Sequence, residues 1–343
     1  MARSRSPISL EAALPDGGKP TLKTIAQMSG LAVPTVSRAL NDAPDIGNST
    51  KALIRKIADE IGYVPNRAGV RLRTGRTNVI SLVMSTQHDN HTGRLISSVA
   101  GGLQGTRYHL NVTPYFPNDD FMKPVRYIVE TGSADAVILN QIEPEDPRVA
   151  YLMEKQFPFA THGRSKWADI HPYYDFDNHA FGYQAMEALH ARGRRNVMVV
   201  APPLAQSYSQ HLVEGLRVCA LKYDILLHVV PGITSDETDI PKLIEAVRAA
   251  LATRPTTDAI ATASTTAAIA SVAALEQSGM TLGGDIDVMS KEAIPFLKLF
   301  RSEILTLSEA VGTAGEFLAK AALNAIQNPT APPMQYLEVP SGR

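Results

Sequence analysis

TLKTIAQMSGLAVPTVSRALN, residues 21–41, is the most informative stretch of this chain. Apolar side chains recur at helical intervals on both sides of Gly30; they are Ile25, Ala26, Leu31, Val36 and Leu40. This spacing predicts two short amphipathic helices joined by a sharp turn. Two helices arranged in this way can present the second one to the major groove of DNA. The stretch therefore predicts a helix-turn-helix.

A third helix and a connector are predicted directly after this motif. Residues 50–62 alternate polar and apolar side chains with a helical period and stop at Gly62. We therefore expect a three-helix head over residues 20–64, preceded by a flexible tail over residues 1–19. Residues 65–76 predict a hinge helix and linker, and a helix of about two turns is marginal in isolation. We expect this hinge to order only against a partner or DNA.

The charge of the chain is concentrated in the head and hinge. Residues 20–76 contain nine basic and four acidic side chains, a net charge of +5, whereas the whole chain carries −1, so the remainder carries −6. Lysine and arginine side chains that meet phosphates release condensed counterions. A basic head on a mildly acidic body is therefore typical of a protein that meets DNA through the head alone.

From residue 77 onward, short apolar runs alternate with helical stretches. The runs cover residues 79–84, 136–139, 197–201, 259–263 and 286–289. Such alternation predicts parallel sheets with helices on both faces, the α/β class. The body of about 265 residues exceeds what one such sheet needs, so we expect two doubly wound lobes.

We expect each lobe of the core, residues 77–343, to be built from two separate stretches of the chain. The first lobe is predicted at residues 77–174 and 308–330, and the second at residues 175–307 and 331–343. Ligands of such sheets bind beyond the carboxyl ends of the strands. The cleft between the lobes is therefore the predicted ligand site.

The composition excludes several classes of protein. Apolar residues make up 44% of the chain, yet no apolar run approaches the roughly 20 residues that cross a bilayer. The N-terminus lacks the pattern of a secretory signal, and the single cysteine, Cys219, suits a reducing cytoplasm. We expect a cytoplasmic protein with no membrane partner.

No pattern of an enzyme or of a cofactor site stands out. No phosphate-binding loop, nucleophile elbow or zinc-protease motif is present, so we expect neither an enzyme nor a cofactor. His88 and His91 are three residues apart, but no third ligand accompanies them, so we expect no metal site. The pairs Asp175 and Asp177, and Asp119 and Asp120, are expected to be turn and cap residues.

Residues 21–41 and 62–68 resemble the head and hinge of the lactose/galactose repressor (LacI/GalR) family. The pattern is T-[LI]-x-x-[IV]-A-x-x-[AS]-G-[VL]-[AS]-x-x-T-V-S-R-x-[LV]-N followed by G-Y-x-P-N-R-A. More than ten fixed positions at fixed spacing make the resemblance specific. The body is similar to the family more loosely, at Asp177, Asn178, Gly182, Leu189, residues 193–195, Gly215 and residues 305–307. The resemblance implies a core like that of periplasmic binding proteins.

The resemblance also implies which residues of the head meet DNA. Val33 and Pro34 stand at the two variable base-reading positions, and Arg38 matches an arginine that can bond guanine. Pro34 is expected at the first position of the recognition helix. Leu72 matches a hinge leucine that enters the minor groove as a wedge, or packs against its counterpart in a dimer. The implied phosphate contacts are Thr21, Thr35, Ser37, Asn41, Tyr63 and Asn66.

The sequence departs from the family at the positions that hold the effector. Leu212 stands where sugar-binding members carry arginine, Ser264 and Thr265 replace an Asn-Asp pair, and residues 290–292 replace Gly-Tyr-Asp. Replacement contacts are expected at strand ends and loops, with Asn140 and Glu292 favoured. The candidates are Ser85, His88, Asp89, Arg94, Asn140, Gln141, His162, Arg164, Tyr208, His211, Ser264, Lys291 and Glu292. Trp167 either stacks on a sugar or packs in the protein.

These observations predict a transcription regulator, a repressor, whose affinity for DNA a small molecule controls. Residues 90–98 and 113–117 are similar to alphaproteobacterial regulators of α-glucoside uptake, which favours a sugar. We expect a homodimer or tetramer on double-stranded DNA with a palindromic operator. Two alternatives stay open: the same fold answering a phosphometabolite or a protein partner, and a solute-binding protein.

Overall fold

The computed structural model describes residues 19–64, 71, 75–86, 90–116, 119–237, 239–293 and 295–340. The chain divides into two compact units, Met1–Thr77 and Asn78–Arg343. Among the described residues, no helix is both long and apolar enough to cross a membrane.

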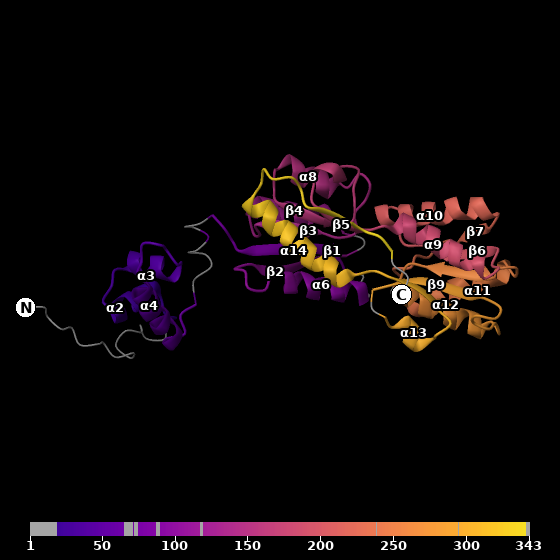
Figure 1. Cartoon of the computed structure of the whole chain (residues 1–343), viewed down its shortest axis with the longest axis horizontal. Coiled ribbons are helices and arrows are strands. Elements are labelled where there is room, and N and C mark those ends of the chain that lie inside the picture. Colours follow the sequence, from indigo (N-terminus) through magenta and orange to yellow (C-terminus); the bar gives the residue numbers. More distant parts are fainter. Residues whose placement is uncertain are drawn as a thin grey trace, which may run out of the picture. The chain divides into compact units, whose positions relative to one another are not determined.

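Residues 19–64 of the first unit form the helices α2 (Leu22–Ser29), α3 (Val33–Leu40) and α4 (Asn48–Glu60) (Figure 1). Thr21 begins α2 with a capping box, in which its hydroxyl accepts a hydrogen bond from the Thr24 amide. Gly30 ends α2 at φ 70°, a left-handed conformation that glycine adopts without strain. The predicted turn therefore lies where the sequence places it.

The core of this unit comes from the apolar residues that the periodicity selects. Fully buried side chains from all three helices pack together; they are Ile25, Val36, Ala39 and Ile54. Because each helix contributes its apolar face, the opposite faces of α2, α3 and α4 remain open to solvent. The helix-turn-helix prediction is confirmed.

The second unit begins with a six-stranded parallel sheet of order β11-β5-β4-β3-β1-β2. Its strands are β1 (Val79–Ser85), β2 (His109–Tyr115), β3 (Ala136–Leu139), β4 (Phe159–His162), β5 (Tyr173–Phe176) and β11 (Gln335–Glu338). Its helices are α6 (Asn90–Gly102), α7 (Met122–Thr131), α8 (Pro147–Glu154), η1 (Ala168–Ile170) and α14 (Val311–Gln327). Helices α6 and α14 cover one face, and α7 and α8 cover the other.

The second sheet is a five-stranded parallel sheet of order β10-β9-β8-β6-β7. Its strands are β6 (Asn196–Val200), β7 (Leu226–Val229), β8 (Ala259–Thr262), β9 (Asp287–Glu292) and β10 (Leu305–Ser308). Its helices are α9 (Asn178–Ala191), α10 (Ser207–Tyr223), α11 (Ile240–Thr253), α12 (Thr265–Gln277) and α13 (Leu297–Phe300). The predicted class, two doubly wound parallel-sheet lobes, is confirmed.

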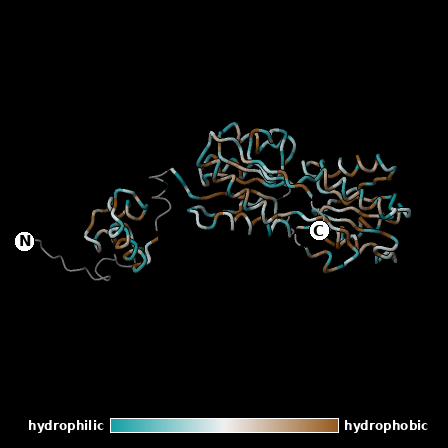
Figure 2. The backbone as a smooth tube through the Cα atoms, viewed as in Figure 1, coloured by the Kyte–Doolittle hydropathy of each residue, from teal (hydrophilic) through white to brown (hydrophobic). Residues whose placement is uncertain are grey.

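The alternation of side chains along β6 explains why helices cover both faces of the second sheet. Val197 and Val199 pack against α9 and α10, whereas Met198 and Val200 pack against α11 and α12. Successive strand residues point to opposite faces, so a strand buried on both sides is apolar throughout. The apolar colour accordingly follows the central strands in Figure 2.

Helices α9 and α10 approach each other through a glycine contact. A Cβ atom on Gly215 would lie 2.0 Å from the carbonyl oxygen of His179, and one on Gly182 would lie 2.4 Å from that of Leu212. No side chain fits at such distances. The resemblance at Gly182 and Gly215 therefore has a packing cause.

Two predicted lobe boundaries are wrong. We expected the second lobe to begin at residue 175, but β5 belongs to the first sheet as far as Phe176. We expected residues 331–343 in the second lobe, but β11 pairs in parallel with β5 at the edge of the first sheet. Leu337 and Glu338 are only half-buried, and Gln335 and Tyr336 are exposed, as suits an edge strand. A strand of this kind has no apolar run, so the sequence carries little signal for it.

Candidate functional site

The recognition helix presents the residues that the family pattern assigns to base reading. Helix α3 begins at Val33 with Ala32 as its N-cap, so Pro34 is the second helical residue and not the first, as we expected. The missing N–H of Pro34 still costs nothing, because the first four amides of a helix have no intrahelical partner. Pro34 and Arg38 are exposed and Val33 is half-buried.

Arg38 forms an ion pair with Asp45 on the surface of the head. The two side chains are 57% and 48% exposed. Because an exposed pair contributes at most about 1 kcal/mol, the guanidinium can leave Asp45 at small cost. Arg38 is therefore free to exchange the carboxylate for an acceptor on a base.

The predicted phosphate contacts lie on the same three-helix unit, at or near its surface. Thr21 and Asn41 are exposed, and the Asn41 side chain donates to the Ser37 carbonyl at 2.6 Å. Thr35, Ser37 and Tyr63 are half-buried, and burial raises the pKa of Tyr63. Asn66 and Leu72 lie outside the described residues, so the hinge contacts stay predictions.

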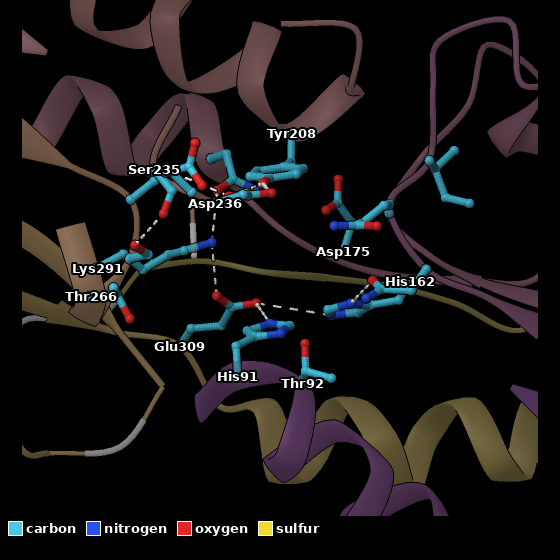
Figure 3. Close-up of a pocket in the computed structure, with 18 of the residues that line it drawn as sticks. His91, Thr92, His162, Asp175, Tyr208, Ser235, Asp236, Thr266, Lys291 and Glu309 are labelled. Carbon is cyan, nitrogen blue, oxygen red and sulfur yellow. Dashed lines mark hydrogen bonds and ion pairs between the residues drawn. The ribbon is translucent and has the colours of Figure 1, made fainter. Parts of the chain in front are cut away.

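A pocket of about 1100 Å³, including its mouth, lies between the two sheets at the carboxyl ends of their strands (Figure 3). Its walls come from both lobes and from the chain that connects them. The lining residues are His91, Thr92, Asn140, Gln141, Ile142, His162, Gly163, Asp175, Asn178, Tyr208, Ser235, Asp236, Glu237, Ile240, Ala263, Ser264, Thr266, Lys291 and Glu309.

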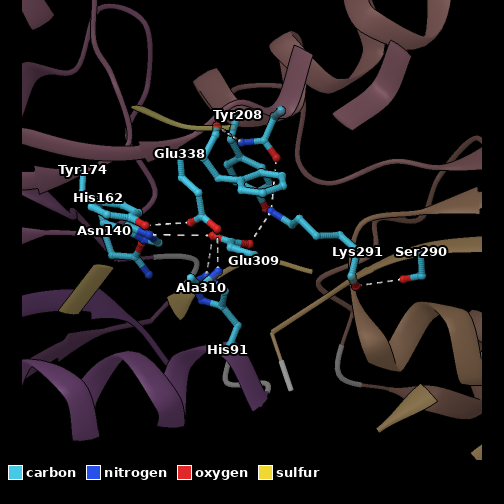
Figure 4. A network of polar contacts seen from close by, with 12 residues as sticks. His91, Asn140, His162, Tyr174, Tyr208, Ser290, Lys291, Glu309, Ala310 and Glu338 are labelled. Atoms are coloured by element: carbon cyan, nitrogen blue, oxygen red, sulfur yellow. Dashed lines mark hydrogen bonds and ion pairs between the residues drawn. The ribbon is translucent and has the colours of Figure 1, made fainter. Parts of the chain in front are cut away.

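Glu309 is the central charged residue of this pocket. It follows β10 on the segment that crosses to α14, and its side chain is 3% exposed. One carboxylate oxygen, Oε2, lies 2.8 Å from Lys291 Nζ, and the other, Oε1, lies 3.3 Å from His91 Nε2 (Figure 4). Burial alone would raise the pKa of Glu309, but Lys291 and then His91 hold it well below the usual range. Glu309 is therefore a buried carboxylate.

Arg164 and Asp175 form a second ion pair at the pocket, with Nε and Oδ2 2.7 Å apart. Asp175 is 5% exposed at its side chain. Burial raises the pKa of Asp175 to about 6, although Arg164 opposes the shift. Lys291, which lines the pocket, and Arg164, which contacts the lining residue Asp175, are thus each neutralised by a neighbouring carboxylate.

His162 is a neutral side chain with one free ring nitrogen directed to Glu309. Its Nδ1 lies 3.0 Å from the Asn140 side-chain oxygen, an acceptor, so Nδ1 carries the proton. Nε2 therefore holds a lone pair, 3.9 Å from Glu309 Oε1. Burial, reinforced by His91, lowers the pKa of His162 to about 3. The ring stacks on that of His91 with centroids 5.2 Å apart.

The second lobe contributes hydroxyl, amide and carboxylate groups. Ser264 begins α12 as its N-cap and donates to the Ser235 carbonyl at 2.9 Å. The Tyr208 hydroxyl lies 3.4 Å from the Asp236 carboxylate. Lys291 also donates to the Asn178 amide oxygen at 3.1 Å. The wall therefore offers both donors and acceptors, with the Tyr208 ring as an apolar surface.

The structure gathers some of the predicted effector residues and separates others. Asn140, Gln141, His162, Tyr208, Ser264 and Lys291 line the pocket. Ser85, Arg94, Arg164, His211 and Glu292 are not among its lining residues. His88 and Asp89 lie outside the described residues.

The excluded residues have separate physical reasons. Ser85 is buried in β1 and Arg94 is exposed on α6. His211 is half-buried on α10, where burial lowers its pKa, and Arg164 reaches the pocket only through Asp175.

Glu292, a favoured candidate, is wrong as a lining residue. It neighbours Lys291 on β9, so the two side chains point to opposite faces. Lys291 faces the pocket, and Glu292 accepts a hydrogen bond from the Leu297 amide at 3.2 Å. Because of this alternation, only Lys291 of the two is available to a ligand.

Sequence reasoning missed Glu309 and did not assign His91 to the effector. It also read Asp175 and Asp177 as a pair of turn and cap residues, but only Asp177 caps a helix, accepting from Ala180. Asp175 and Glu309 stand at or just after strand ends, so the strand-end rule that selected Asn140 would also have selected both. Trp167 packs in the first lobe, and Lys166 lies 4.8 Å from its ring centre.

Comparison with known proteins accounts for both units. Residues 21–66 match the bacterial regulatory proteins of the lacI family, and residues 107–320 match the periplasmic binding proteins and sugar binding domain of the LacI family. The chain is 31% identical over 329 residues to the HTH-type transcriptional regulator AglR of Rhizobium meliloti (strain 1021), covering 92% of this chain and 90% of that protein. It is 24% identical to CelR of Thermobifida fusca, over 93% and 95% of the two chains.

Solved structures share the fold. The Lac repressor dimer bound to operator and an anti-inducer superposes with a TM-score of 0.80 at 17% identity, over 94% of this chain and 97% of that one. A CelR–cellobiose complex superposes with a TM-score of 0.68 at 21% identity, over 94% and 98%. Together with the matches over residues 21–66 and 107–320, these similarities show that the chain belongs to the LacI family of bacterial transcription regulators.

Proposed function

We propose that this regulator is a repressor that binds a palindromic operator as a dimer and answers a neutral, polyhydroxylated molecule, a sugar, in its cleft. The protein works in the cytoplasm, where the DNA is, and has no catalytic role. The observation that carries the proposal is the charge of the pocket, where Lys291 and Arg164 each already face a carboxylate.

The paired charges favour a neutral ligand over an anionic one. A phosphate is held by charge-assisted hydrogen bonds from cations that can reach it. Among the described residues of the pocket, a phosphosugar would have to displace Glu309 from Lys291, or Asp175 from Arg164. Removing one partner from a buried pair costs about 3–5 kcal/mol. A phosphometabolite is therefore a poorer fit than a sugar.

The uncharged groups of the pocket suit sugar hydroxyls. Asn140, Ser235 and Ser264 offer amide and hydroxyl groups within a cavity that also contains apolar Ile142 and Ile240. Pockets of this kind orient a ligand through a few polar groups set in an apolar lining. The CelR structure is a complex with cellobiose. The resemblance of residues 90–98 and 113–117 favours an α-glucoside for this chain.

Control of DNA binding requires that the sugar distinguish two states of the core. The pocket draws its walls from both lobes, so a ligand that fills it favours one relative position of the lobes. A ligand can shift operator affinity only by its differential affinity for the two states, and operator shifts sugar affinity by the same factor. The alternative function, solute binding, is less favoured, because it does not require a helix such as α3 with exposed residues that can read DNA.

The test measures operator and sugar binding on the full chain. Fluorescence anisotropy with the DNA upstream of the chain's own gene should detect binding to a palindromic site. The α-linked and β-linked disaccharides should alter the affinity for that site. In a thermal shift assay, a ligand at about 100 times its dissociation constant should add about 2.7 kcal/mol.

Matched variants connect the response to the pocket. Asn140→Ala should weaken the sugar response, whereas Asn328→Ala, which changes an exposed asparagine after α14, should leave it unchanged. A response to sugar phosphates but to no neutral sugar would overturn the proposed ligand class. Equal affinity for the palindrome and for random duplex would overturn the proposed DNA reading.

A further inference from the structure

His91, His162 and Glu309 converge on one side of the pocket from three separate parts of the chain (Figure 4). His91 lies in the first turn of α6, His162 ends β4, and Glu309 follows β10. One ligand atom from each of the three residues lies within 4.8 Å of the other two. The fold thus supplies His91 with two partners that lie far from it in the sequence.

The distances approach those of a metal centre. Zinc binds nitrogen and oxygen at about 2.1 Å, which separates two ligands of a tetrahedral site by about 3.4 Å. Glu309 Oε1 lies 3.3 Å from His91 Nε2 and 3.9 Å from His162 Nε2. The separation between His162 Nε2 and Glu309 Oε1 would have to shorten by about half an ångström to reach the tetrahedral spacing.

Glu309 and His162 already have the chemical form that a metal requires, whereas His91 Nε2 donates a hydrogen bond to Glu309 Oε1 and would release its proton when a metal binds. The Asn140 oxygen accepts a hydrogen bond from Nδ1 of His162, which leaves the Nε2 lone pair directed to the cluster. Such an outer partner fixes the tautomer and orientation of metal-bound histidines. Lys291 holds Oε2 of Glu309 and thereby leaves Oε1 to the histidines.

We propose that His91, His162 and Glu309 form a binding site for one divalent transition-metal ion of the zinc class. Two imidazoles and one carboxylate select zinc, cobalt or nickel over magnesium or calcium, which prefer oxygen ligands. Three protein ligands leave one coordination position, and all three residues line the pocket, from which water or a ligand hydroxyl would complete the site.

This site is independent of the proposed sugar response, because metal binding can be measured without DNA or sugar. Untagged full-length protein, stripped with a chelator, would be titrated with Co²⁺ and followed by visible absorption. We expect one Co²⁺ per chain, displaced by Zn²⁺ and not by Mg²⁺. The Asn140→Ala variant should bind Co²⁺ about 10- to 100-fold more weakly, since it loses the partner that orients His162.

Ligand variants and a matched control complete the test. His162→Gln, Glu309→Gln and His91→Asn should each weaken Co²⁺ binding at least as much as Asn140→Ala. Because His91 is only half-buried, His91→Asn is the ligand variant least able to disturb folding. His228→Gln, on β7 and outside the pocket lining, should bind as the wild type does. Absence of Co²⁺ bands, or bands that all three ligand variants retain, would overturn the proposal. Metal binding with no sugar response would leave it standing and refute the proposed effector instead.

Discussion

The head and the cleft differ in how far their charged side chains are exposed to solvent. In the head, Arg38 is more than half exposed and its partner Asp45 is nearly so, whereas in the cleft Lys291 and Glu309 are 9% and 3% exposed. Exposed charges are screened and exchange partners cheaply, while buried ones must stay paired. The difference indicates that the head suits a polyanion and that the cleft suits a neutral molecule.

The largest expected contrast is in salt dependence. Between 50 and 200 mM salt, a protein with about 6–10 phosphate contacts loses about 10³–10⁵ in DNA affinity. Sugar affinity should change less than about twofold over the same range, because the buried pairs of the cleft are little screened. Anisotropy for DNA and calorimetry for sugar, on one protein preparation, would measure both. A steep salt dependence of sugar binding would mean that the cleft contains an exposed unpaired charge.

Removing a buried cation should have the next largest effect. Lys291→Met leaves the Glu309 carboxylate without its ammonium partner and should lower the free energy of unfolding by about 3–5 kcal/mol. The same substitution at Lys155, in an exposed pair with Glu154, should leave the free energy of unfolding nearly unchanged, because solvent screens the pair. Urea denaturation would measure both variants.

A double variant separates the loss of the pair from the loss of packing. Lys291→Met combined with Glu309→Leu removes both charges and should recover most of the stability. If the double variant is as unstable as the single one, the cost does not come from an unpaired carboxylate.

A moderate effect is expected at the recognition helix. Arg38→Ala should weaken operator binding by about 1–3 kcal/mol and spare affinity for random duplex, because one guanidinium reads a base while many groups meet phosphates. Arg248→Ala, which removes a comparably exposed, ion-paired arginine from α11, should leave both affinities unchanged. Equal losses on the two DNAs would assign Arg38 to phosphate contact.

The smallest effect is expected from pH. The pKa of His162 is about 3 in the folded protein, below the usual 6.5, so the unfolded chain takes up the proton first as pH falls. The stability that neutral His162 provides should decline below pH 6.5 by up to about 1.4 kcal/mol per pH unit. Asp175, with its pKa raised to about 6, acts in the opposite direction in this range.

Comparing the wild type with His162→Gln removes the contribution of Asp175, which both proteins share. The difference between their free energies of unfolding should shift in favour of the variant as pH falls from 6 to 5. A difference that stays constant over this range would show that His162 is not held neutral by burial.

The sequence predicted the head more fully than the cleft. The turn at Gly30 and the buried faces of α2 and α3 depend on residues close together in the chain, so periodicity alone located them. The two parallel sheets also followed from buried, apolar strands. Strand β11 escaped detection because an exposed edge strand has no such run.

The cleft depends on which side chains meet after folding, and this information is not local. The strand-end rule located Asn140 and Lys291, yet the family alignment favoured Glu292, which the pleat of β9 turns away. Glu309 directly follows β10, where the strand-end rule applies, but its neighbours in the sequence do not show that its side chain is buried. Only the tertiary structure shows that Lys291 and His91 lie against its buried charge and stabilise it.

The position of Glu309 between β10 and α14 has a consequence for protein engineering. A chimaera that takes one lobe from this regulator and the other from a relative must inherit this connection from one parent alone. Glu309 would then come from one parent, and either Lys291 or the two histidines would come from the other. Transferring ligand specificity between members of the family therefore requires transferring the connecting segment together with both walls of the pocket.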